Sequence, residues 1–301
     1  MQTYNIPLNK DRKELTSHGS KEFPIAIYET ELKKNILGYV PWHWHEELQF
    51  CYVLRGSVDF HINSQVITLT PDQGLFIAPN ILHMADSTDP EATYVCLDVK
   101  PVFLSSFSDS IISRRYIYPI INSSAFSYWI FPGNEPYETE IIDKMKQIYA
   151  DYKKKGVGYE IDIHITLLAL WKIMFLHMQA QEDRRPAVSF QKDNERIKQI
   201  MSYIHEHFSS PITLDEIAEH VALSKNECCR AFKKYMGHSI FQYIISYRIS
   251  RSEELLLTTN WPVSVIANIC GFNSSSYYID KFKAEKGMTP GEYRSTTPSR
   301  S

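Results

Sequence analysis

Three histidines in the first third of the chain have the types and spacing of a binding site. His43 and His45 lie two residues apart in PWHWHEELQ, and His83 follows Pro79 in GLFIAPNILH. Side chains two apart on a β-strand project from the same face, so His43 and His45 point together, and His83 could join them. Neutral imidazole binds divalent metals and also hydrogen-bonds polar ligands. The trio is therefore the first candidate for chemistry.

The segment around His43 resembles the first motif of the cupin β-barrel, and GLFIAPNILH resembles the second. In metal-binding cupins a glutamate joins the histidines, but the matching residue here is Gln49, whose amide is a poorer ligand than a carboxylate. Glu46 and Glu47 could substitute, although Glu46 fits the strand parity of the histidines poorly and Glu47 would have to reach from further along. We therefore expect no bound metal and no cofactor; if a metal were present, the three histidines would hold it.

Sensor cupins similar to this one bind a small organic ligand, which the resemblance implies for this chain. Trp42 and Trp44 fall on the strand face opposite the histidines. Aromatic and polar side chains near the pocket suit a sugar by stacking and hydrogen bonding, although each is also normal in barrel packing, with the histidines satisfied in the core. The candidate pocket residues are Trp42, His43, Trp44, His45, Gln49, Tyr52, His61 and His83.

The last hundred or so residues contain two predicted helix starts in quick succession. In PITLDEIAEHVALSKNECCRAFKKYMG the runs TLDE and SKNE are capping boxes, each of which marks the start of a helix. Val221 to Leu223 lies between the two helices and is too short for antiparallel packing. The pattern predicts a helix-turn-helix whose second helix is exposed for the major groove of DNA.

The segment WPVSVIANICGFNSSSYYIDKFKAEKGMTP repeats this pattern further along the chain. Pro262 suits the first turn of a helix, Gly271 allows the turn, and a second recognition helix is expected from about Asn273. Both segments end in FK-x-x-x-G. One such motif is a weak signal, but two in tandem strongly indicate DNA binding.

This half of the chain resembles the AraC-type DNA-binding domain over almost its whole length. The resemblance implies two subdomains joined by a long helix, here about Ser239 to Leu257, which would place both recognition helices in successive major grooves. The matching pieces are Ile217-Ala218, Leu223-Ser224, Arg230, Phe232-Lys233, Gly237, Tyr243, Arg248, Ile266-Ala267, Gly271-Phe272, Phe282-Lys283, Gly287, Thr289-Pro290 and Tyr293-Arg294.

Carried over by position, the resemblance assigns base-reading and phosphate-binding residues to the two recognition helices. Arg230 is the strongest candidate, because arginine can contact guanine through two hydrogen bonds. Asp280 departs from the basic residue common in similar proteins, so we expect the second helix to read weakly. The base-reading candidates are Asn226, Cys229 and Arg230, then Ser275, Ser276 and Ile279, and the phosphate candidates are Lys225, Lys233, Lys234, Lys281, Lys283 and Lys286.

The elements that must position these residues fall into two predicted domains, since 301 residues exceed one comfortable core. From about Phe23 to Val99, short β-rich runs with period-2 alternation predict a small barrel or sandwich. Beyond Pro136 the period becomes helical. We predict a cupin-like barrel with two flanking helices in residues 1–180, a linker in 181–192, and an all-α tandem helix-turn-helix domain in 193–301.

The two flanking helices carry large apolar residues on more than one side, the second from about Tyr159 to Gln181. Two interpretations are equally favoured: both helices pack on their own barrel, or part of their surface pairs two chains into a homodimer.

Composition and charge are those of an ordinary globular protein. Residues 1–191 carry a net charge of −5 and residues 192–301 a net charge of +2, a weak indication of a nucleic-acid partner in the second half.

Five cysteines without zinc or disulfide spacing suit a reducing compartment, and the start lacks the apolar core of a signal peptide. Charged residues and histidines interrupt the apolar run Ile161 to Met178. We expect a cytoplasmic protein without a membrane span.

These patterns predict a sequence-specific DNA-binding regulator that responds to a small molecule, a sugar or a related metabolite, and that is not an enzyme. One alternative is a metal-dependent cupin oxygenase or isomerase with a DNA-binding appendage, which the Gln49 substitution disfavours. The other is a regulator whose barrel only dimerises and binds no ligand.

Overall fold

The computed structural model describes residues 6–9, 12–35, 37–62, 65–105, 107, 110–123, 126–182 and 190–296. The chain divides into two compact units, residues 1–194 and 195–301. The predicted linker 181–192 includes the end of α4 (Tyr159–Glu182) and the start of α5 (Phe190–His207). Residues 183–189 between them lie outside the described residues.

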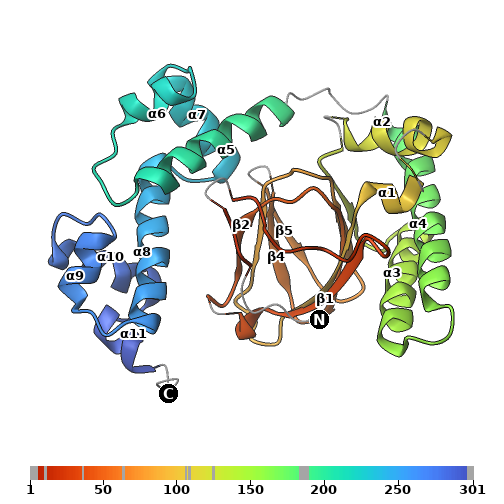
Figure 1. The fold of residues 1–301 in the computed structure, drawn as a ribbon, viewed down its shortest axis with the longest axis horizontal. Coiled ribbons are helices and arrows are strands. Elements are labelled where there is room, and N and C mark those ends of the chain that lie inside the picture. The colour runs from red at the N-terminus through yellow and green to blue at the C-terminus, as the bar shows by residue number, and fades with distance from the viewer. Residues whose placement is uncertain are drawn as a thin grey trace. The chain divides into compact units, whose positions relative to one another are not determined.

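The first unit is a barrel of two antiparallel sheets (Figure 1). One sheet has the order β1-β8-β3-β6-β9 and the other the order β2-β7-β4-β5. In the described residues the strands are β1 (Ile25–Glu31), β2 (Val40–His43), β3 (Leu48–Arg55), β4 (Val58–Ile62), β5 (Gln65–Leu69), β6 (Gly74–Ile77), β7 (His83–Asp86), β8 (Thr93–Val99) and β9 (Tyr128–Phe131).

Strand register brings the two sequence motifs together. In the β2–β7 pair His43 lies directly opposite His83, although forty residues separate them in the chain. On the neighbouring sheet Gln49 of β3 lies opposite Asp98 of β8, and both are buried. Because side chains alternate between strand faces, these residues are directed into the barrel.

Helices cover one side of the first unit. A short 3-10 turn, Leu32–Lys34, follows β1, and the segment Pro101–Ser105 (α1), Ser113–Ile117 (η2) and Tyr118–Ile121 (α2) follows β8. The long helix α3 (Pro136–Lys154) packs on β3, β9 and α4.

The predicted flanking helices are confirmed as α3 and α4, and both contribute to the barrel core. Ile141 and Met145 of α3 and Leu167 of α4 are fully buried. Ile161 and Ile165 of α4 remain 65% and 61% exposed, so this helix also presents apolar surface outward. By length and composition alone, Tyr159–Ala180 could cross a membrane, which is weak evidence because 44% of its apolar window is buried in the protein.

In its described residues, 195–296, the second unit contains helices and no strands, as predicted. After α5 come α6 (Leu214–His220), α7 (Lys225–Met236), α8 (Ile240–Thr258), α9 (Val263–Ile269), α10 (Ser275–Lys286) and α11 (Pro290–Thr296). The long helix α8 has α6 and α7 at one end and α9 and α10 at the other (Figure 1). The helix α11 follows the loop after α10.

Reciprocal caps begin the helices of the first helix-turn-helix. Thr213 accepts a hydrogen bond from the Glu216 amide while the Glu216 carboxylate accepts one from the Thr213 amide, and Ser224 and Glu227 repeat this at α7. These are the two capping boxes predicted from TLDE and SKNE. Further caps of the same kind begin α8, at Ser239, and precede α11, at Thr289. Each cap satisfies amides that a helix start otherwise leaves without a partner.

One arginine of the long helix α8 contacts both helix-turn-helix motifs. The Arg248 guanidinium donates hydrogen bonds to the carbonyl oxygens of Phe208 and Ser210, at 2.7 and 2.8 Å, and lies beside the ring of Phe272. Gly271, in the turn between α9 and α10, lies close to both Phe208 and Arg248. The loop after α5 and the α9–α10 turn are therefore held on the same side chain.

Candidate functional site

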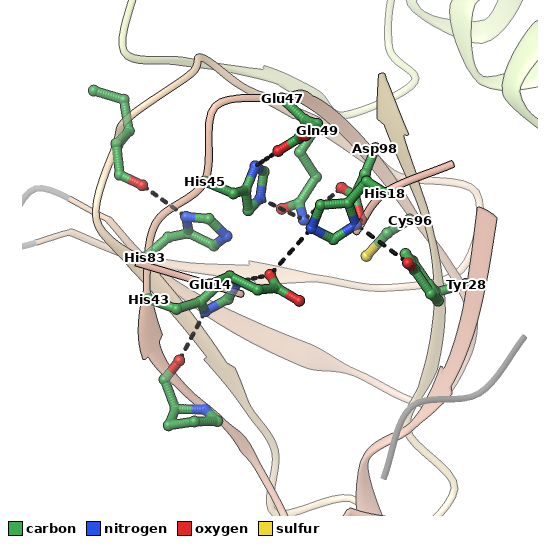
Figure 2. A network of polar contacts seen from close by, with 12 residues as sticks. Glu14, His18, Tyr28, His43, His45, Glu47, Gln49, His83, Cys96 and Asp98 are labelled. Carbon is green, nitrogen blue, oxygen red and sulfur yellow. Dashed lines mark hydrogen bonds and ion pairs between the residues drawn. The ribbon is translucent and has the colours of Figure 1, made fainter. Parts of the chain in front are cut away.

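A polar cavity lies inside the barrel. Figure 2 shows its polar side chains converging from the N-terminal segment and from several strands. Its lining is mixed, and the apolar lining residues include Val40, Phe60 and Tyr94. The polar lining residues are Glu14, His18, Tyr28, Thr30, His43, Gln49, His83 and Asp98.

The three predicted histidines come together: His43 and His83 line this cavity, His45 packs beside them, and each is 3% exposed. The ring centroids are 4.2 Å apart for His43 and His83, 5.2 Å for His45 and His83, and 5.8 Å for His43 and His45. Nδ1 of His43 lies 2.8 Å from the carbonyl oxygen of Pro41, and Nδ1 of His83 lies 2.8 Å from that of Ile81. Since a carbonyl only accepts, Nδ1 carries the proton in both rings and Nε2 keeps its lone pair.

The environment keeps these imidazoles neutral. Burial lowers the pKa of His43, His45 and His83, and the charge of neighbouring histidines lowers the pKa of His45 and His83 further. Within the described residues, Nε2 of His83 and Nδ1 of His45 have no hydrogen-bond partner. Buried polar atoms without a hydrogen-bond partner are uncommon, so these nitrogens are suited to bind a ligand or an ion.

A second group, of mixed charge, adjoins the histidines. Nε2 of His18 lies 3.5 Å from Oε2 of Glu14, and Nδ1 of His18 lies 3.5 Å from Oδ2 of Asp98 and 3.2 Å from the Tyr28 hydroxyl. Burial by itself lowers the pKa of His18, but the hydrogen bond with Glu14 and the charges of Asp98 and Glu14 raise it to about 9. Burial raises the pKa of Asp98 to about 7, although the positive charge of His18 acts to lower this pKa.

Gln49 occupies the cavity as predicted, but its amide is already engaged. Its Nε2 donates to Oδ1 of Asp98 at 3.0 Å and lies 3.3 Å from Nε2 of His45. The two glutamates considered as substitutes behave differently: Glu47 is buried, 3.7 Å from Nδ1 of His45, whereas Glu46 is exposed and forms an ion pair with Lys13.

Four predicted pocket residues lie away from the cavity because of strand alternation. Trp42 lies on β2 and Trp44 directly follows this strand, and both side chains project to the face opposite the histidines. The Lys13 ammonium lies over the ring of Trp44. Tyr52 alternates with Gln49 along β3 and is buried against Tyr149 of α3. His61 alternates with Phe60, which lines the cavity, and instead hydrogen-bonds Asp86 at 3.1 Å.

Sequence reasoning missed Glu14, His18 and Asp98. Asp98 had a readable signal, because it falls on the same parity as Tyr94 and Cys96 in the apolar run TYVCLDV, so the strand directs a carboxylate inward. Glu14 and His18 belong to an N-terminal segment without periodic pattern. Its position depends on backbone pairing with Trp44, whose carbonyl accepts from the Glu14 amide at 2.9 Å.

The base-reading candidates on α7 are mostly accessible. Asn226 and Arg230 are exposed and Cys229 is half-buried, while Cys228 and Phe232 on the other face are fully buried. On α10 the accessible candidate is Ser276, whereas Ser275 is half-buried and Ile279 packs partly against the core of this unit. Tyr277, which sequence reasoning did not select, is 45% exposed on the same helix.

The lysine candidates divide into accessible and engaged side chains. Lys233, Lys234 and Lys283 are exposed. Three others have intramolecular contacts: Lys225 pairs with Asp215 at 2.6 Å, Lys281 lies 5.3 Å from the ring centre of Tyr277, and Lys286 pairs with the buried carboxylate of Glu253 at 2.9 Å. The Lys286 ammonium is only 17% exposed, so this lysine supports the fold.

Comparison with known proteins covers both units. A family model described as an AraC-like ligand binding domain matches residues 35–169, and one described as a helix-turn-helix domain matches residues 217–296. The C-terminal domain of the two-component response regulator yesN from Fusobacterium nucleatum is similar to 32% of this chain over 93% of its own length, with 33% identity and a TM-score of 0.31.

Full-length relatives match almost from end to end. The HTH-type transcriptional regulator YdeC of Bacillus subtilis is 36% identical over 292 residues, which cover 96% of this chain and 98% of that protein. The melibiose operon regulatory protein of Escherichia coli is 23% identical over 311 residues, covering 100% of this chain and 98% of that protein. The chain therefore belongs to the AraC family of transcription regulators, with a ligand-binding domain followed by a DNA-binding domain.

Proposed function

We propose that this regulator binds a specific operator through α7 and α10, and that a small molecule in the barrel cavity alters this binding. The observation that carries the proposal is the two-sided character of α7: Cys228 and Phe232 are buried in the unit, while Asn226 and Arg230 on the opposite side are exposed. A helix with one buried face and hydrogen-bonding side chains on the other suits a major groove.

Replacing Arg230 with alanine tests the DNA-binding part. We expect the variant to lose its preference for guanine at one or two operator positions, at a cost of about 1–3 kcal/mol in binding free energy, because the bidentate contact disappears. The measurement is selection of bound DNA from a random pool by the full chain. The control is Arg115→Ala, which removes an exposed arginine from the first unit. An unchanged guanine preference in the Arg230 variant would show that Arg230 is not a base-reading residue.

The cavity supports a small polar effector, and we propose a sugar or a related metabolite. Donors and acceptors of His18, Gln49 and Asp98 line the cavity together with the apolar side chains of Phe60 and Tyr94. A polyhydroxy ring offers hydroxyls to the polar side chains and C–H surface to the apolar ones. The melibiose operon regulatory protein, a distant relative, is named for a sugar operon.

Thermal unfolding of the full chain with a panel of sugars tests the effector. A ligand at one hundred times its dissociation constant stabilises the folded state by about 2.7 kcal/mol, so its melting temperature rises with concentration. Gln49→Ala should lose this response and His61→Ala, outside the cavity, should keep it. If no sugar shifts the transition, the effector belongs to another chemical class or the barrel serves only to dimerise.

We also infer that the chain is a cytoplasmic homodimer and not an enzyme. The exposed apolar residues Ile161, Ile165 and Leu176 follow α4 at helical spacing, a surface that a second copy could cover. Sedimentation of the samples used for the sugar panel measures the assembly, and a monomeric mass at micromolar concentration would contradict the dimer. The non-enzymatic assignment is supported by Gln49 at the position where metal-dependent cupins place a carboxylate.

A further inference from the structure

Three hydrogen-bond acceptors lie close together in the cavity (Figure 2). Nε2 of His43 keeps its lone pair, because Nδ1 of this ring donates to the Pro41 carbonyl. It lies 3.8 Å from Oε2 of Glu14, and an ionised carboxylate also only accepts. The third acceptor is Nε2 of His83, which is buried and has no hydrogen-bond partner among the described residues. Acceptors in such an arrangement are satisfied only by a group that brings donors.

A primary ammonium group matches this arrangement better than water or a hydroxyl. A hydroxyl has one donor and water has two, whereas a primary ammonium has three N–H donors and no acceptor. A tetrahedral nitrogen with hydrogen bonds of about 2.8 Å holds its acceptors about 4.6 Å apart. The Glu14–His43 distance is 3.8 Å, and one ring nitrogen of His43 lies within 4.8 Å of one of His83.

The charges in the cavity also favour a cationic ligand. Two carboxyl groups share one imidazole, since the ring nitrogens of His18 lie 3.5 Å from an oxygen of Glu14 and 3.5 Å from an oxygen of Asp98. The described lining residues include neither lysine nor arginine. Asp98 also accepts from the Gln49 amide, so Glu14 is the carboxylate that remains beside the histidine lone pairs. A cation there would pair with a buried negative charge.

We propose that the effector carries a primary ammonium group, which donates to Nε2 of His43, to Nε2 of His83 and to the carboxylate of Glu14. This inference rests on the proposed function and narrows its effector class, from a sugar or related metabolite to an aminated compound of this kind, such as an amino sugar. The hydroxyl and C–H groups of such a compound still match the other polar and apolar lining residues.

Titration of the full chain with methylammonium tests the proposal without knowledge of the rest of the effector. The chain carries ¹⁵N-histidine, a chelator is present, and ionic strength is constant. We expect the Nε2 signals of His43 and His83, assigned from their glutamine variants, to shift with a dissociation constant of about 10 mM or more, the limit for so small a ligand. Tetramethylammonium has the same charge but no N–H donor, so it should bind at least about 10-fold more weakly.

Glu14→Gln tests the carboxylate, because it removes the charge and keeps the size of the side chain. Methylammonium should bind about 10–100-fold more weakly to this variant, since hydrogen bonds to charged groups are the stronger ones. Glu46→Gln is the matched control: Glu46 is exposed and pairs with Lys13, so this variant should bind as the parent does. If Glu14→Gln does not fold, the two ammonium ions compared on the parent chain still decide the class of ligand.

Three results would overturn the assignment. They are equal binding of the two ammonium ions, unchanged histidine signals at saturating methylammonium, and parent signals that change when the chelator is added, which would place a metal ion on these lone pairs. Failure of this inference is distinct from failure of the proposed function. A neutral sugar that raises the melting temperature, with no response to methylammonium, rejects only the ammonium group. Methylammonium binding, with no amine or sugar altering operator binding, rejects only the effector role.

Discussion

Replacing Lys286 with methionine is expected to destabilise the second unit by about 3–5 kcal/mol, because it leaves a buried carboxylate without its partner. Glu253 of α8 is 1% exposed, and the Lys286 ammonium at the end of α10 lies 2.9 Å from its Oε2. Burial raises the pKa of Glu253, while the charge of Lys286 acts in the opposite direction. Without the lysine, the carboxylate must either stay charged in a poor environment or take up a proton.

Lys283→Met is the matched control, since Lys283 lies on the same helix and is exposed. Urea unfolding of the full chain, with hydrogen exchange of α8 and α10 amides, measures the loss. The deficit of Lys286→Met should be larger at pH 8 than at pH 5. The folded-state pKa of Glu253 is raised, so the uncompensated charge costs stability above that pKa and protonation removes the cost below it. Equal stability of the two variants at pH 8 would show that the pair contributes nothing.

Replacing Gly271 with alanine should cost about 2–5 kcal/mol, from two separate causes. The φ of Gly271 is +80°, a left-handed conformation that side chains rarely adopt. In addition, a Cβ there would lie 2.2 Å from the Phe208 carbonyl oxygen and 3.0 Å from Nε of Arg248. The methyl group would therefore force apart the hydrogen bond between Arg248 and Phe208.

Gly237→Ala separates these two causes. Gly237 has φ +78° at the end of α7, but nothing lies within 4 Å of an added Cβ, so only the backbone cost of about 1–2 kcal/mol is expected. Thermal and urea unfolding of the two variants give the difference, which measures the close approach around Arg248. Identical losses of unfolding free energy in both variants would mean that the loop after α5 moves away from the added methyl group at no free-energy cost.

The helical unit could be predicted closely from the sequence because its signals are local. The capping boxes at Thr213 and Ser224 and the apolar positions around Cys228 and Phe232 lie within a few residues of the structure they specify. The short β-rich runs between about Phe23 and Val99 were predicted for the same reason, because period-2 alternation is also a local signal. The base-reading and phosphate assignments stay predictions until DNA binding is measured.

The cavity was only half predictable because it depends on pairing between distant segments. The His43 and His45 spacing specified a shared face, and the register of β2 with β7 then placed His83 opposite. No local pattern specified that the N-terminal segment would pair with Trp44 and bring Glu14 and His18 inside. Strand alternation did contain the information that Tyr52 and His61 face away, and counting parity from Gln49 and Phe60 would have excluded both.

The reciprocal caps of the second unit also determine how it can meet a polyanion. At α7 the Ser224 hydroxyl accepts from the Glu227 amide and the Glu227 carboxylate accepts from the Ser224 amide, and these contacts lower the pKa of Glu227, so it remains negative at neutral pH. A phosphate approaching this helix start would meet two occupied amides and a like charge. The ionic-strength dependence of operator binding must therefore arise from flexible ammonium groups such as Lys233 and Lys234 rather than from the helix dipole.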